Sequence, residues 1–231
     1  MRHQRIYIVG FLLILAIGAQ AQKRLLAPEM YIGVHGGAIG STVLFNPARE
    51  TMSPFLNGAI LGGTGGLVFR YSEQKCCGVQ VELNYMQRGW REAGANINGR
   101  ETNYTRKLHY LELPFLMHIY FGKPSFRGFV NLGPQIGYCI KEEVNNLNPE
   151  GYPDQPEYGK ITHPFDWGVA GGLGFYYRSR KAGVYQLEVR ANYSLGTLFD
   201  NKAGADFKMS NSLNIGIHLA WLWEFRRPKG E

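Results

Sequence analysis

The last strand-like segment of the chain alternates strictly between large apolar residues and smaller or polar ones. In SLNIGIHLAWLWEF, residues 212–225, every second position is apolar: Leu213, Ile215, Ile217, Leu219, Trp221, Trp223 and Phe225. A period of two is typical of a β-strand and excludes a helix over this segment. The apolar row covers 13 residues. At about 3.3 Å per residue and a tilt near 45°, such a row spans roughly 30 Å, which is enough to cross a hydrocarbon layer.

Similar strand-like segments recur along the chain. Eight are predicted, at 29–41, 57–72, 76–90, 104–122, 125–141, 163–179, 183–197 and 208–225. Three of the connections are tight turns (SEQ, GKPS and SRKA), and four are long and polar (42–56, 91–103, 142–162 and 198–207). Short turns at one end and long loops at the other are typical of an outer-membrane barrel. The pattern therefore predicts an all-β protein, an eight-stranded antiparallel transmembrane β-barrel.

The aromatic residues indicate which face of each strand is outside. Alternation alone also fits a soluble sandwich, whose polar face would meet water. Two aromatic belts at opposite ends of an apolar band are instead what a membrane interface selects. One predicted belt lies near the short turns and the other near the long loops: Tyr71, Phe121, Tyr177, Tyr185, Trp221, Trp223 and Phe225 in the first, and Tyr138, Trp167 and Tyr193 in the second. We therefore expect the apolar face to contact the lipid of the outer membrane.

The first 21 residues have the pattern of a secretory signal peptide. Arg2 and Arg5 give a positive start, residues 6–17 form an apolar run, and Ala19-Gln20-Ala21 suits a cleavage site. The run is shorter than the roughly 20 residues that a membrane-spanning helix needs. The predicted domain division is a signal peptide at residues 1–21 and a barrel domain at residues 22–231.

Composition agrees with an exported membrane barrel. Charged residues make up 19% of the chain, against about a quarter in an average soluble domain. The net charge of +7 could suggest a nucleic-acid partner, but the sequence carries no nucleic-acid-binding motif. We predict no nucleic-acid partner and no cofactor.

The inward row of the predicted strands carries charges of both signs in equal number. These are Arg70, Arg88, Arg127, Arg178 and Arg190, with Glu82, Glu112, Asp166, Glu188 and Glu224. An eight-stranded barrel is only wide enough inside to hold side chains, and charges in so narrow a space must be matched. We predict a structural ion network that plugs the lumen. A catalytic or proton-relay cluster of Glu82, Glu112 and Arg190 is the alternative.

An enzyme is the less favoured function class. His35, His109, His118, His163 and His218 could each supply a base, but neither a nucleophile elbow nor a metal-binding His pair accompanies them. We expect His118 and His218 to be polar residues of the core. Cys76, Cys77 and Cys139 lack the spacing of a metal site, and a disulfide between the adjacent Cys76 and Cys77 would be strained. We predict no catalytic residues and no metal site.

Several segments resemble the PorT-like porin family, the small outer-membrane β-barrels of the Bacteroidota. The resemblance rests on GVQVELNYMQRGWRE, YLELPFLMHIYF, GFVNLGPQIGYCI, FDWGVAGGLGFYY and the closing aromatic strand. It covers nearly the whole chain after residue 21, and Tyr-Leu-Glu-Leu-Pro at 110–114 is its most specific piece. It implies the barrel fold and an outer-membrane location. It also suggests an accessory role in a secretion machine of the type IX kind or in envelope assembly, with a lipid-modifying enzyme as a third alternative.

The long loops are the predicted interaction surface. Residues 141–160 carry five acidic residues, two Lys, two Tyr and three Pro. Pro stiffens a loop and Tyr supplies amphipathic contact area, so this segment suits a protein or glycan partner, although a merely solvated loop has the same composition. The closing aromatic strand resembles the signal that the barrel-assembly machinery binds during insertion. The function predicted first is thus a structural or interaction role, with a plugged lumen and no general pore.

Overall fold

The computed structural model describes residues 28–47, 57–72, 76–97, 100–147, 161–179, 181–199 and 207–226. These residues form antiparallel strands: β1 (Glu29–Pro47), β2 (Asn57–Gly58), β3 (Ile60–Ser72), β4 (Cys77–Ile97), β5 (Arg100–Lys123), β6 (Phe126–Leu147), β7 (Phe165–Ser179), β8 (Gly183–Ser194) and β9 (Phe207–Arg226). The predicted signal peptide at residues 1–21 lies outside the described residues and stays a prediction. In the described ranges, no helix is long and apolar enough to cross a membrane.

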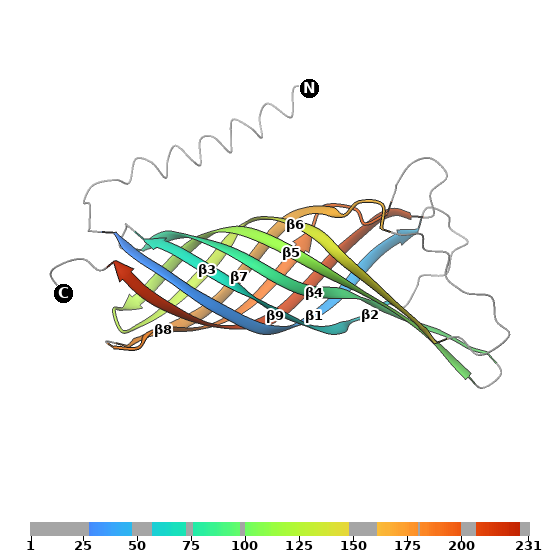
Figure 1. The fold of residues 1–231 in the computed structure, drawn as a ribbon, viewed down its shortest axis with the longest axis horizontal. Helices are drawn as coiled ribbons and strands as arrows, with labels where there is room; N and C mark the ends of the chain where they lie inside the picture. The colour runs from blue at the N-terminus through green and yellow to red at the C-terminus, as the bar shows by residue number, and fades with distance from the viewer. Residues whose placement is uncertain are drawn as a thin grey trace, which may run out of the picture.

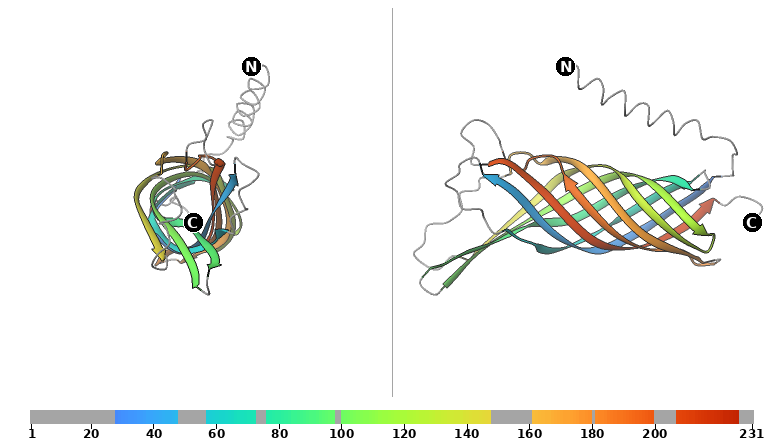
Figure 2. Two further views of the ribbon diagram at one scale, coloured as in Figure 1. Left: turned by 90° about the vertical axis from the view of Figure 1, so that its right-hand side faces the viewer. Right: turned by 180° about the vertical axis from the view of Figure 1, so that it is seen from behind.

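The sheet closes on itself. β2 and β3 both pair with β4, so the two-residue β2 continues the wall position of β3, with Ala59 as the interruption. β9 pairs with β1 on one side and with β8 on the other, and β4 pairs with β5. The wall therefore has eight strand positions, which confirms the predicted eight-stranded antiparallel barrel (Figures 1 and 2).

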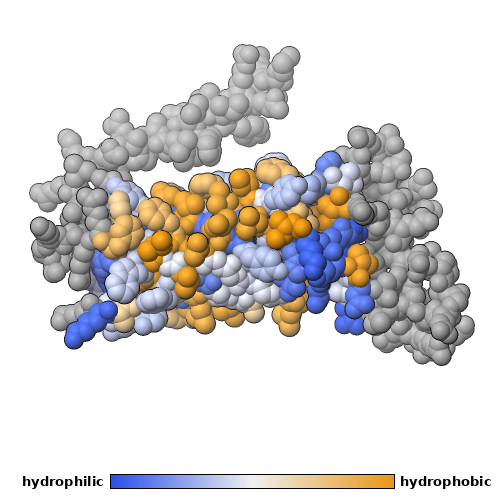
Figure 3. Space-filling view, in the orientation of Figure 1, coloured by the Kyte–Doolittle hydropathy of each residue, from blue (hydrophilic) through white to orange (hydrophobic). Residues whose placement is uncertain are grey.

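The alternation in the sequence fixes which side chains face outward. In β9, Ile215, Ile217 and Leu219 are more than half exposed, whereas the intervening Asn214 and His218 are buried. The other strands repeat this pattern, and apolar side chains gather in a band along the barrel (Figure 3). An exposed apolar band over a polar interior reverses the order of a soluble protein, because the outer surface meets hydrocarbon. The predicted outward orientation of the apolar row is confirmed.

The two ends of the barrel differ in how the strands are joined. β5 and β6 are joined by the two-residue turn Pro124-Ser125, and the chain enters β1 and leaves β9 at this same end (Figure 1). At the turn between β7 and β8, Gly183 has a φ of 84°, which a side chain would disfavour. Trp221 Nε1 donates a hydrogen bond of 2.7 Å to the carbonyl oxygen of Ala182 and so holds that turn. Short turns mark the periplasmic end of such barrels.

At the opposite end, β1, β4, β5 and β6 are longer than predicted, whereas β7 begins at Phe165 and not at 163, and β8 ends at Ser194 and not at 197. The prediction of a long loop at 91–103 is wrong, because β4 runs to Ile97 and β5 begins at Arg100. The boundaries predicted at 42 and 142 are also wrong, since β1 runs to Pro47 and β6 to Leu147. The described pairing of β6 with β7 ends at Tyr138 and Phe165, whereas β6 stays paired with β5 up to Leu147. β4, β5 and β6 therefore continue beyond the rest of the barrel as a sheet of three strands (Figure 1).

An arginine introduced on the lipid-facing row should destabilise the barrel more, the closer it lies to the bilayer midplane. We expect Leu113→Arg and Ile217→Arg each to lower the free energy of unfolding by about 2 to 4 kcal/mol, the cost of a cation near the bilayer midplane. Val144→Arg is the matched control, because Val144 is exposed on the part of β6 that extends past β7. It should cost less than about 1 kcal/mol. Urea titrations in lipid vesicles measure the difference, and equal losses for all three variants would contradict the assignment of the band.

Candidate functional site

The ten charged residues predicted for the lumen all lie on the inner side of the wall. Seven are buried: Arg70, Glu82, Arg88, Glu112, Asp166, Glu188 and Arg190. The other three are half-buried and lie toward the short-turn end: Arg127, Arg178 and Glu224. The structure divides them into three groups at successive levels of the barrel.

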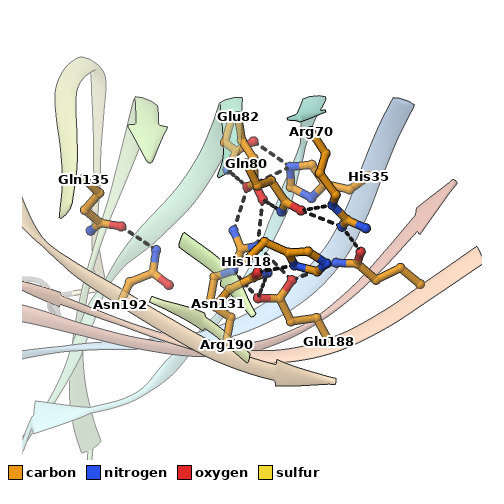
Figure 4. Close-up of polar contacts among 12 residues, drawn as sticks. His35, Arg70, Gln80, Glu82, His118, Asn131, Gln135, Glu188, Arg190 and Asn192 are labelled. Atoms are coloured by element: carbon orange, nitrogen blue, oxygen red, sulfur yellow. Dashed lines mark hydrogen bonds and ion pairs between the residues drawn. The ribbon is translucent and has the colours of Figure 1, made fainter. Parts of the chain in front are cut away.

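The central group is built on Arg190 of β8. Its guanidinium donates to both carboxylate oxygens of Glu82 on β4, at 2.6 and 2.7 Å, and to both oxygens of Glu188, at 2.9 and 2.8 Å. β4 and β8 are not neighbours in the sheet, so the ion pair between Arg190 and Glu82 crosses the lumen (Figure 4). Charge-assisted bonds of this bidentate kind are the strong ones, and burial removes the water that would weaken them.

Amide side chains complete the central group. Glu82 also accepts bonds from Gln80 Nε2 and Asn84 Nδ2, at 2.5 and 2.8 Å. Arg70 donates to Gln80 Oε1 at 2.8 Å and to Gln186, so amide oxygens satisfy this buried cation. Each carboxylate thus has several donors, as a buried charge requires.

The second group lies nearer the long-loop end and is centred on Arg88. Arg88 donates to Glu112 Oε1 at 3.2 Å and to Asp166 Oδ2 at 2.5 Å, and Ser194 donates to the other oxygen of Asp166. The guanidinium carbon lies 3.4 Å from the centre of the Tyr110 ring. Two carboxylates thus share one cation here. Three buried atoms of the group, Arg88 Nε, Tyr110 Oη and Glu112 Oε2, have no hydrogen-bond partner among the described residues.

The third group lies at the short-turn end. Arg178 of β7 donates to Glu224 of β9 at 2.5 Å and to Glu29 of β1 at 3.2 Å, and the Tyr31 hydroxyl donates to Glu29 at 2.7 Å. Arg127 instead donates to the Tyr176 hydroxyl at 3.2 Å. These bonds join the first and last strands to β7 near the point where the chain enters and leaves the barrel.

Two buried apolar clusters lie within the barrel together with these charged groups. The cluster toward the short turns contains Tyr31, Val68, Tyr120, Phe129, Tyr176, Val184 and Leu222. The cluster toward the long loops contains Val43, Trp90, Leu108, Tyr110, Leu198 and Phe199. The central polar group thus has bulky apolar side chains on either side of it along the barrel axis.

Three charged residues of the lumen were missing from the sequence prediction. Glu29 binds Arg178, and Arg106 pairs with Glu142, with its guanidinium carbon 5.5 Å from the centre of the Trp90 ring. The inward direction of Arg106 could have been predicted, because Arg106 lies an even number of positions from the inward Tyr110 on the same strand. Glu142 could not, because the sequence placed it in a loop.

The buried histidines contact neutral side chains, and His35 Nε2 also lies 3.9 Å from Glu82 Oε2. His118 and His218 are buried, as predicted. His118 Nδ1 lies 2.7 Å from Asn131 Oδ1, His35 Nε2 lies 2.6 Å from Asn84 Oδ1, and the His35 and His218 rings stack at 5.5 Å. In the described part of the chain, no group of three or more His, Cys, Asp or Glu could hold a metal ion. Cys76, Cys77 and Cys139 form no disulfide among the described residues.

The residues of the predicted aromatic belts lie on the outer surface. Phe121, Tyr138, Trp167, Tyr177, Tyr185, Trp221, Trp223 and Phe225 are each more than two-fifths exposed, and Tyr71 and Tyr193 are half-buried. Tyr177 and Tyr185 are directly paired across β7 and β8, and Trp221 continues this row on β9. Amphipathic rings in these positions suit the level of the lipid head groups.

Comparison with known proteins gives matches to a family and to solved structures. A family model described as "Outer membrane protein beta-barrel domain" matches residues 19–200. The outer membrane protein OprG from Pseudomonas aeruginosa has a similar structure, with a TM-score of 0.52 and 14% sequence identity over 86% of this chain and 97% of OprG. The attachment invasion locus protein Ail of Yersinia pestis gives a TM-score of 0.41 and 10% identity over 84% of this chain and 99% of Ail. No curated protein matches the chain.

Proposed function

The chain belongs to the outer membrane protein beta-barrel domain family, and for this member we propose a structural or interaction role, with a lumen closed to ions and solutes. The protein lies in the outer membrane, where its apolar band contacts lipid. The proposal concerns what the barrel does there. A filled lumen would leave the outer surface and the long-loop end as the parts of the molecule that other molecules can reach.

The observation that carries the proposal is the group formed by Arg190, Glu82 and Glu188. It crosses the lumen, its members are at most 3% exposed, and its cation is bonded to both carboxylates. Selective pores instead present rings of one charge sign to a water-filled path. Here one cation is paired with two carboxylates, one of them across the axis, and apolar clusters lie on either side.

The long-loop end is the proposed place of contact with a partner. β4, β5 and β6 extend there beyond β7, and their described surface includes the exposed Lys141, Glu143 and Val144. Such an extension suits a protein or glycan partner. An accessory role in a type IX-like secretion machine or in envelope assembly, as the PorT-like resemblance suggests, would use the same surface. Residues 148–160 of the predicted interaction loop lie outside the described residues.

Planar-bilayer recording tests the closed lumen. We expect the purified, refolded protein to give no steady single-channel steps, because the network of Arg190 would have to break before ions could pass. A general porin reconstituted in the same bilayers provides the positive control, and Ile217→Ala, which changes only the lipid-facing row, should stay silent as well. Steady steps from the unmodified protein, above the level of a mock purification, would refute the closed-lumen function.

A further inference from the structure

An apolar groove of about 240 Å³ lies on the lipid-facing side where β4, β5, β6 and β7 meet. The residues that line it are Leu83, Leu111, Glu112, Leu113, Ile136, Gly137, Tyr138 and Phe165, and the Glu112 carboxylate is buried on the inner side of the wall. Its volume falls below the roughly 300 to 1,000 Å³ of pockets that enclose compact small molecules. A groove this narrow and apolar, on a surface that meets hydrocarbon, suits a single alkyl chain.

Cationic side chains follow the groove on the same outward row. On β5 this row runs from Leu111 through His109 to Lys107, and the neighbouring β6 places Lys141 directly beside His109. On β4, Arg91 is exposed and pairs with Thr105. These residues lie where β4, β5 and β6 leave the apolar band, and a strongly hydrophilic patch borders the band at its long-loop end (Figure 3).

The described outward side chains beyond the groove include two lysines, Lys107 and Lys141, and one acid, Glu143. Glu143 accepts a bond of 2.6 Å from Lys141 Nζ and lies 3.6 Å from His109 Nε2. The ion pair between Lys141 and Glu143 is exposed and therefore weak, so a phosphate can compete with Glu143 for Lys141, and Lys107 supplies a second cation.

The height of the cations above the groove matches the level of lipid head groups. Lys107 precedes Leu111 by four positions on β5 and lies nearer the long-loop end. At about 3.3 Å per residue and a tilt near 45°, its backbone lies roughly 9 Å nearer the outside than the upper rim of the groove. Lys side chains at this level reach into the head-group region while their stems stay on apolar surface.

We propose that the groove, Lys107 and Lys141 together bind one lipid of the outer leaflet whose phosphate head group carries a net negative charge. An acyl chain lies in the groove against Leu111 and Ile136, and the phosphate oxygens accept hydrogen bonds from Lys107 and Lys141. The occupant is a bilayer lipid, because a free phosphate would gain nothing from the groove. This site is independent of the closed lumen, since a conducting barrel would keep the same outer surface.

Native mass spectrometry of the full chain tests the proposal. The protein is taken from mixed micelles that contain equal amounts of phosphatidylglycerol and phosphatidylcholine with the same acyl chains. We expect phosphatidylglycerol to be retained about tenfold more than phosphatidylcholine, because its head group is anionic and lysines attract anionic lipid head groups, whereas the choline group neutralises the phosphate of phosphatidylcholine. The double variant Lys107→Gln/Lys141→Gln should retain both lipids about equally. Lys123→Gln removes an exposed Lys at the opposite end and should leave the preference unchanged.

Two further measurements separate the groove from the charges. Ile136→Trp fills the groove while all cations stay, and it should reduce the retention of phosphatidylglycerol. Excess inorganic phosphate should not displace the retained lipid. The proposal would be overturned if the unmodified protein retained both lipids equally, or if the double variant and Lys123→Gln changed the preference to the same extent. Displacement of the lipid by phosphate alone would also overturn it. Heat-dependent mobility in gels confirms that each variant is folded.

Discussion

A chain that ends at Ala220 is expected not to accumulate in the outer membrane. The missing residues 221–226 supply the ladder partners of Val34 and Ile32 on β1 and of Tyr185 on β8. Without them, the edges of β1 and β8 are left with unpaired backbone groups facing lipid, and each such group costs several kcal/mol. The truncated chain should stay in the periplasm and be degraded, which cell fractionation and immunoblotting measure.

The matched control ends at Arg226, the last residue of β9. It removes only residues 227–231 and keeps every described pair of the closing strand. This shorter truncation should reach the outer membrane at the level of the full chain. If the chain ending at Ala220 were found there at the same level, in a folded and protease-resistant form, closure by β9 would not be required for stability.

Arg190→Ala is expected to lower the free energy of unfolding by about 3 to 5 kcal/mol, the cost of removing one partner of a buried ion pair. Glu82 and Glu188 would both keep their charge and lose their shared cation. Other donors to these carboxylates remain, among them Asn84 and Asn131, but they are neutral. Urea titration of the refolded variant in lipid vesicles, followed by Trp fluorescence, measures the loss.

Arg127→Ala is the control for the size of this effect. Arg127 also lies inside the barrel, but it is half-buried, and its bond is to the neutral hydroxyl of Tyr176. Its removal should cost about 1 kcal/mol, as for an ordinary hydrogen bond. Similar losses for Arg127→Ala and Arg190→Ala would show that the central group does not act as a buried ion network.

The direction in which each side chain points could be predicted from the sequence, because a membrane barrel requires apolar residues on its outer row. A strand has a strict period of two, and lipid on one side forces the outer row to be apolar. The row from Leu213 to Phe225 therefore identified the strand, and the aromatic belts at the two ends of such rows identified the outer face. The same parity placed Glu82, Glu188 and Arg190 on the inner side.

The partners of the inner charges could not be predicted. Arg190 and Glu82 are 108 residues apart, and they meet because the closed barrel brings β8 opposite β4. Equal numbers of acids and arginines suggested simple pairing, but Arg70 is satisfied by the amides of Gln80 and Gln186. Pairing inside a barrel depends on the stagger between strands, which a list of inward residues does not contain.

The ends of the strands were missed for a different reason. Beyond the apolar band, the outer row of β5 and β6 is polar, with Lys107, His109, Lys141 and Glu143, so the alternation that revealed the strands is lost. Glu142 was therefore assigned to a loop, although it lies on β6 and pairs with the buried Arg106. Outside the membrane, a strand ends where its backbone pairing with the neighbouring strand ends. The periodicity of the sequence does not reveal this pairing.

The ion pair across the lumen also bears on the kinetics of folding. Contacts between residues far apart in the chain form slowly, because the entropy of closing the intervening loop is lost before the contact forms. Until β1 and β9 meet, the carboxylates of Glu82 and Glu188 and the guanidinium of Arg190 remain hydrated on the concave side of an open sheet. Expulsion of that water and assembly of the ion network would then coincide with the final docking of the first strand against the last. In a half-closed barrel, Glu82 would have lost hydration before it reaches Arg190, so this form would be a barrier rather than a resting state on the folding path.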